Sequence, residues 1–135
     1  MRVPAVLDAC TLIAYLRREP GWIAVRELLS EGRTNSFIHA VNLVEVHYDM
    51  ARVEGRERAD IFIADLVQAG MTISRDLDDE FCDVVAGLKS RGRISLADCF
   101  CIALANRLGG EVWTADRAEF QPMHDAGACR AVFIR

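Results

Sequence analysis

The sequence predicts an α/β domain built around a short parallel sheet. Short apolar segments typical of strands alternate with longer segments of helical periodicity, the order expected of a parallel sheet covered by helices. The first strand, at residues 3–7, is apolar throughout, as a strand buried on both faces should be. The helix predicted at residues 95–108 is apolar nearly all round, so we expect it to be buried in the core.

Helix breakers and caps set the other predicted boundaries. Pro20 and Gly21 separate a first helix from a second, which ends near residue 30 before Gly32, and Gly70 closes a later helix. We expect Asp76 to be the N-cap of a helix that ends near residue 89. The predicted strands cover residues 3–7, 35–38, 71–73, 112–114 and 131–134, and the remaining helices cover residues 10–18, 40–53, 56–69 and 95–108.

Length and composition indicate one globular domain spanning residues 1–135. The chain has 135 residues without a linker or repeat, and 52% of them are hydrophobic. No apolar run approaches the roughly 20 residues of a membrane span, and the first residues do not read as a signal peptide. We therefore expect a cytoplasmic protein. The five scattered cysteines include no Cys-x-x-Cys pair, which indicates reduced thiols rather than disulfides or a zinc site.

The net charge of −4 argues against a broad phosphate-binding face, which would normally be basic. It does not exclude a nuclease, because a bound metal ion can carry the positive charge locally. Lys89 is the single lysine, so nearly all the basic side chains are arginines, which pair well with phosphate.

Four acidic residues stand in otherwise apolar segments: Asp8, Glu45, Asp98 and Asp116. Asp8 and Asp116 each follow a predicted strand, and Asp98 interrupts the apolar helix. Acidic side chains are rarely buried unless they are paired or bound to metal. Because parallel strands end at one edge of a sheet, where ligands bind, the acids predict a carboxylate site for a hard divalent cation.

Three of these acids also have a local interpretation as helix caps. Asp8 could cap the helix that follows it. The pairs Ser95 with Asp98, and Asp116 with Glu119, have the spacing of capping boxes. Capping and metal binding are compatible roles for one carboxylate, since helix N-termini also attract anions.

Glu45 lies beside a helical stripe formed by Val41, Val44, Tyr48 and Ala51. We expect this stripe to face the core, which would place Glu45 at the border of the buried face. The alternative is an ordinary solvated glutamate on the helix surface.

The acids and their neighbours resemble the motifs of the PIN-domain family, and more narrowly those of VapC-like toxin ribonucleases. The motifs occur in order at residues 6–10 (VLDAC), 42–46 (NLVEV), 95–99 (SLADC) and 112–120 (VWTADRAEF), and together they span nearly the whole chain. The resemblance implies a three-layer α/β/α fold with a short central parallel sheet. It also implies a Mg²⁺-dependent endoribonuclease acting on single-stranded or structured RNA, a homodimer, and a cognate antitoxin that blocks the site.

On this resemblance Asp8 and Asp98 bind the principal Mg²⁺ or Mn²⁺ ion. Asp116 binds the ion directly or through water, or supports a second ion. Glu45 orients or deprotonates the attacking water, or binds the second ion. Carboxylate oxygens suit these hard cations, and a bound cation activates water and neutralises phosphate charge.

The chain departs from the family pattern at Cys10, where the family usually has serine or threonine. Thr11 follows it, and we expect Thr11 and Thr114 to position water or the metal-binding carboxylates. The alternative to a nuclease is a PIN-like module that binds RNA or protein without cutting. A nucleotide-binding Rossmann domain is disfavoured, because no glycine-rich turn follows the first strand.

Overall fold

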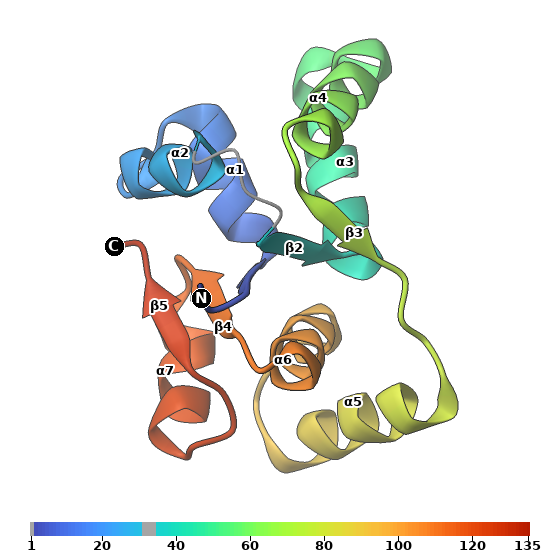
Figure 1. Cartoon of the computed structure of the whole chain (residues 1–135), viewed down its shortest axis with the longest axis vertical. Helices are drawn as coiled ribbons and strands as arrows, with labels where there is room; N and C mark the ends of the chain where they lie inside the picture. The colour runs from blue at the N-terminus through green and yellow to red at the C-terminus, as the bar shows by residue number, and fades with distance from the viewer. Residues whose placement is uncertain (1, 31–34) are drawn as a thin grey trace.

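A computed structural model describes residues 2–30 and 35–135, so the expected helix end at Gly32 lies outside the described residues. The strands are β1 (Ala5–Leu7), β2 (Ser36–His39), β3 (Thr72–Ser74), β4 (Glu111–Thr114) and β5 (Ala131–Phe133). The helices are α1 (Ala9–Arg17), α2 (Trp22–Ser30), α3 (Ala40–Glu54), α4 (Arg56–Gln68), α5 (Asp79–Arg91), α6 (Leu96–Leu108) and α7 (Arg117–Asp125). The strands form one parallel sheet in the order β3-β2-β1-β4-β5 (Figure 1).

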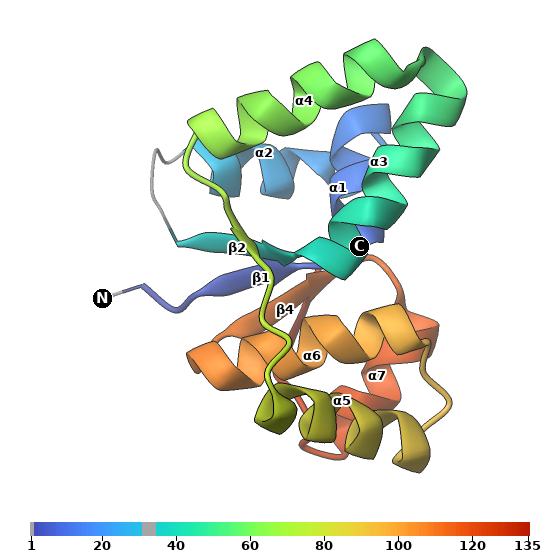
Figure 2. The ribbon, with the colours of Figure 1, turned by 90° about the vertical axis from the view of Figure 1, so that its right-hand side faces the viewer.

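Helices cover both faces of the sheet, which confirms the expected three-layer α/β/α fold. Figure 2 shows α1 to α4 on one side of the sheet and α5 to α7 on the other. Side chains alternate along β1, so Val6 packs in the cluster with α5, α6 and α7, while Ala5 and Leu7 pack with α1 to α4. None of the helices in the described ranges is long and apolar enough to cross a bilayer.

The parallel topology brings the ends of β1 and β4 together. These two strands are neighbours, with Leu7 opposite Trp113, and the amide of Asp8 donates to the Trp113 carbonyl at 3.2 Å. Asp8 and Asp116 therefore follow adjacent strands at one edge of the sheet, as expected from parallel pairing.

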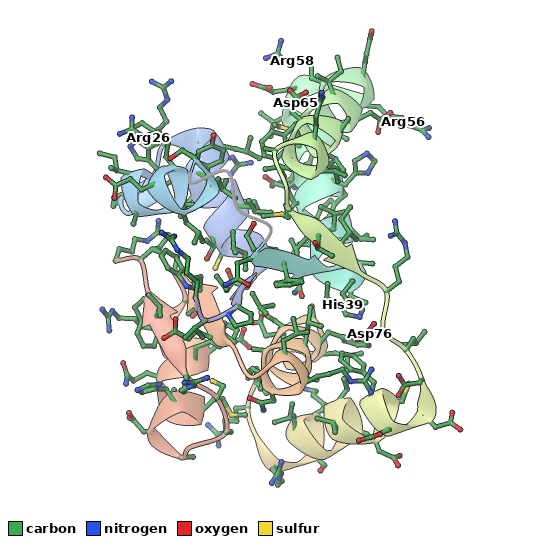
Figure 3. All side chains as sticks on the ribbon, viewed as in Figure 1. Arg26, His39, Arg56, Arg58, Asp65 and Asp76 are labelled. Carbon is green, nitrogen blue, oxygen red and sulfur yellow. The ribbon has the colours of Figure 1, made fainter. Side chains whose placement is uncertain are left out.

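The predicted cap of α5 was wrong by two residues. Asp78, not Asp76, is the N-cap, and its Oδ1 accepts from the Phe81 amide at 2.9 Å. The Asp76 carbonyl instead accepts from Nε2 of His39, which carries the proton because Nδ1 accepts from a backbone amide (Figure 3). Arg107 pairs with the carboxylates of both Asp76 and Asp78, and the helix begins after Asp78.

The expected buried face of α3 was also wrong. Val44 and Tyr48 are 66% and 55% exposed, whereas Asn42 and Val46 are buried. Helical spacing shows that a helix has an apolar stripe, but not which stripe the rest of the fold covers. Here α1, α4 and α6 pack against α3 and leave the stripe with Val44 and Tyr48 open to solvent.

Candidate metal centre

The carboxylate of Asp8 is buried at the end of β1, and both of its oxygens accept hydrogen bonds. Its Oδ1 accepts from the Thr11 amide at 2.9 Å, so Asp8 is the N-cap of α1. Its Oδ2 accepts from Oγ1 of Thr114 at 2.6 Å and from Sγ of Cys10 at 3.0 Å. Burial raises the pKa of Asp8, and these hydrogen bonds oppose the rise. Each carboxylate oxygen has two lone pairs, which leaves Asp8 able to bind a cation as well.

Thr114 and Thr11 have different roles beside this carboxylate. The Thr114 hydroxyl donates to Asp8 and accepts from the Asp116 amide at 2.9 Å, so it connects two of the predicted site residues. The Thr11 hydroxyl donates its single proton to the Trp113 carbonyl at 2.7 Å, and the Thr11 backbone amide donates to Asp8. The Thr11 hydroxyl therefore has no second proton to donate to Asp8 and does not replace the side chain at position 10.

Cys10 occupies the place where a hydroxyl would contact Asp8. Its thiol donates to the carboxylate, but sulfur is a weaker donor than oxygen. Burial and the charge of Asp8 raise the pKa of Cys10 far above its ordinary value. Because the thiolate is the metal-binding form, a thiol that stays protonated is not a ligand for a hard cation here.

A second group of carboxylates gathers beside Asp8. Oxygens of Asp98, Asp116 and Glu119 all lie within 4.8 Å of one another. Burial raises the pKa of Asp98, and the carboxylates of Glu119 and Asp8 raise it further. Without a cation, burial and the repulsion among three acids this close make Asp98 keep a proton near neutral pH, which a divalent cation would displace.

Two capping arrangements hold this group together. Ser95 caps α6 by accepting from the Asp98 amide at 3.1 Å, and Asp116 caps α7 by accepting from the Glu119 amide at 3.1 Å. Glu119 then crosses to the other helix, where its Oε1 accepts from the Ser95 amide at 2.6 Å. The caps that the sequence suggested as local features therefore interlock and bring the starts of α6 and α7 together.

Glu119 joins this group, although its place in the sequence indicated only a helix cap. The available signal was its spacing, because a residue three after Asp116 lies on the same side of the helix. That spacing could not show that Asp98 faces the same point from a different helix.

Glu45 borders the group from α3. It is half-buried, and burial together with the charges of Asp8, Asp49 and Glu119 raises its pKa. Glu45 and Asp8 thus lie within electrostatic reach of the group without belonging to its closest set. The donors are carboxylate oxygens, which fit Mg²⁺ or Mn²⁺.

Comparison with known proteins identifies the family. The profile of the PIN domain matches residues 5–123, and the chain belongs to this family. The resemblance of the sequence motifs to the PIN-domain family is therefore confirmed. No curated protein is close enough in sequence to match the chain.

Solved structures share the fold over nearly the whole chain. A toxin–antitoxin complex from Klebsiella pneumoniae matches with a TM-score of 0.73 and 14% identity, covering 97% of this chain and 98% of the other. VapBC2 from Rickettsia felis, bound to a DNA fragment from its promoter, matches with a TM-score of 0.70 and 15% identity, covering 96% and 97%. VapBC-1 from nontypeable Haemophilus influenzae matches with a TM-score of 0.69 and 20% identity, covering 96% and 97%. At these identities the likeness establishes the fold.

Proposed function

We propose that this chain is a Mg²⁺-dependent endoribonuclease and the toxin of a VapBC-type pair. The observation that carries the proposal is the group formed by Asp98, Asp116 and Glu119, with Asp8 and Glu45 beside it, at the edge of a PIN-domain sheet. Mn²⁺ would serve as an alternative ion. The likeness to chains crystallised as toxin–antitoxin complexes supports the narrower assignment.

In the proposed phosphodiester hydrolysis, the acidic residues have two different roles. Asp8, Asp98 and Asp116 hold the ion, and we add Glu119 to this set. A bound divalent ion lowers the pKa of water and neutralises charge on the scissile phosphate. Glu45 orients or deprotonates the attacking water, for which its raised pKa suits it, because a general base works best when its pKa is close to the operating pH.

Cleavage of RNA with and without a chelator tests the proposal. We expect purified protein to cut single-stranded or structured RNA with Mg²⁺ or Mn²⁺ and to stop when the ion is removed. Asp98→Asn should abolish cleavage and leave the fold intact, because the amide keeps the size of the carboxylate. Full activity of this variant in a clean preparation would contradict the assignment, and RNA binding without metal-dependent turnover would favour the non-catalytic alternative.

An antitoxin is the proposed protein partner, and a groove offers it a place to bind. The groove has a volume of about 360 Å³ and lies between α1 and the hairpin of α3 and α4. Ile13, Leu16 and Phe62 supply apolar walls, while Arg58 and Asp65 add charges near the top of the molecule in Figure 3. An amphipathic antitoxin segment fits this mixture, and Leu16→Glu should weaken the complex without changing cleavage by the free toxin.

A homodimer is the proposed assembly. Val44 and Tyr48 on α3, and Leu96 at the start of α6, are large apolar side chains that stand 54–66% exposed. Val44 and Tyr48 lie one helical turn apart, and adjacent exposed apolar side chains are a common mark of an interface. Light scattering should give twice the chain mass for the native protein, and Val44→Lys with Tyr48→Lys should give the monomer mass. A native monomer would contradict this part of the proposal.

A further inference from the structure

Asn42 is a polar side chain at a buried position where an apolar side chain would cost less free energy to bury. It is fully buried on α3, and its Nδ2 donates to the carbonyl of Ala97 at 3.1 Å. Its Oδ1 is buried and has no hydrogen-bond partner among the described residues. A buried amide oxygen without a partner destabilises a fold, because it loses its hydrogen bonds to water without replacement.

The hydrogen bond of Asn42 joins the two helices that carry site acids. Asn42 precedes Glu45 by three residues, so both lie on neighbouring parts of one helix face. Ala97 directly precedes Asp98 in the first turn of α6. The contact therefore connects the turn that carries Glu45 to the turn that carries Asp98.

No packing reason requires an amide at this position. Val46, one turn further along α3, is equally buried and is apolar. Leucine has the same branched shape and the same number of side-chain heavy atoms as asparagine, although it is bulkier, and it would leave no polar atom unpaired. Residues that break a local rule in this way occur most often at functional sites.

We propose that Asn42 is a positioning residue of the metal site, which fixes α3 against α6 so that Glu45 and Asp98 face the ion together. This inference rests on the proposed function, because it assigns a role within the same site. Asn42 acts through the backbone of Ala97 and is not itself a ligand. Residues that hydrogen-bond directly to metal ligands typically change metal affinity about 10–100-fold when they are replaced, so we expect an effect at the lower end of this range for Asn42.

The test compares Asn42→Leu with Val46→Ala. We expect Asn42→Leu to lower the thermal midpoint in chelator because it adds bulk to a packed site, to weaken Mn²⁺ binding about 10-fold by calorimetry, and to lower kcat without raising KM for RNA. Val46→Ala, on the same buried face but without a polar contact, should lower the midpoint and leave Mn²⁺ affinity unchanged. If Asn42→Leu does not fold, Asn42→Ala removes the same hydrogen bond without adding bulk and takes its place.

The outcomes separate this inference from the proposed function. Wild-type Mn²⁺ affinity and kcat in a folded Asn42 variant overturn the positioning role while the nuclease assignment stands. Failure of Asp98→Asn to weaken Mn²⁺ binding overturns the metal site itself, and with it the basis of the inference. Equal losses of Mn²⁺ affinity in Asn42→Leu and Val46→Ala also overturn it, because the effect would then follow from general packing.

Discussion

Replacing Glu119 with glutamine isolates the charge of the acid that the structure adds to the site. Glutamine keeps the volume of the side chain and an oxygen that can accept from the Ser95 amide. The substitution removes one negative charge from the group with Asp98 and Asp116. It therefore tests electrostatics with little change in packing.

The size of the effect follows from the spacing of the carboxylates. Two unit charges 4.8 Å apart, the limit set by this group, repel by about 3 kcal/mol at an effective dielectric constant of about 20. Shorter separations would strengthen this repulsion and partial exposure to solvent weakens it, so the figure gives its order of magnitude. We expect Glu119→Gln to lower the pKa of Asp98, to leave the thermal midpoint in chelator unchanged or higher, and to weaken Mn²⁺ binding at least about 10-fold.

Calorimetric titration with Mn²⁺ and thermal unfolding in chelator provide the two readouts. Asp125→Asn is the matched control, because it removes the same charge from the same helix, where Asp125 contacts Gln121 instead of the group. Equal Mn²⁺ affinities for Glu119→Gln and Asp125→Asn would refute the reasoning. A loss of affinity together with a large loss of stability would show that Glu119 holds α6 and α7 together rather than binding the ion.

Three further predictions concern pH, packing and thiol reactivity. Burial raises the pKa of Asp98 above its value in the unfolded chain. In chelator, the stability that protonated Asp98 contributes at acid pH is therefore lost as the pH rises through neutrality. Mn²⁺ should reverse this trend in the thermal midpoint. Gly110→Ala places a methyl group 2.4 Å from the carbonyl oxygen of Pro4. The free energy of unfolding measured in urea should therefore fall by about 1–3 kcal/mol. An unchanged urea midpoint would show that the strand moves freely. Exposed Cys82 should react with a thiol reagent well before Cys10, whose pKa burial raises, and comparable rates in mass spectrometry would contradict the buried geometry at Cys10.

Much of the fold could be predicted because its signals are local. The uniformly apolar first strand and the apolar helix at α6 were both expected to be buried, and both are. The caps at Asp8, Ser95 and Asp116 were also correct, because a cap depends on only three or four successive residues. The cap of α5 was misplaced because Asp76 and Asp78 are both suitable cap residues, and the local sequence does not distinguish them.

The orientation of α3 could not be predicted from its own residues. Val44 and Tyr48 form an apolar stripe at ideal helical spacing, yet the fold covers the other side of the helix. A periodic pattern shows which face a helix could bury. The face that α3 does bury depends on how α1, α4 and α6 pack against it. The stripe left open is consistent with the proposed homodimer.

The sequence by itself determined the kind of site, because acids that interrupt apolar strands and helices must be satisfied by a partner, and a parallel sheet ends its strands at one edge. The roles of Asp8, Asp98, Asp116 and Glu45 as metal-binding or catalytic residues stay predictions. Only the tertiary structure showed which acids meet, placing Glu119 against Asp98 and Asp116. The reason is physical: a short sequence motif fixes the geometry of one helical turn, but the distance between two turns depends on how their helices pack.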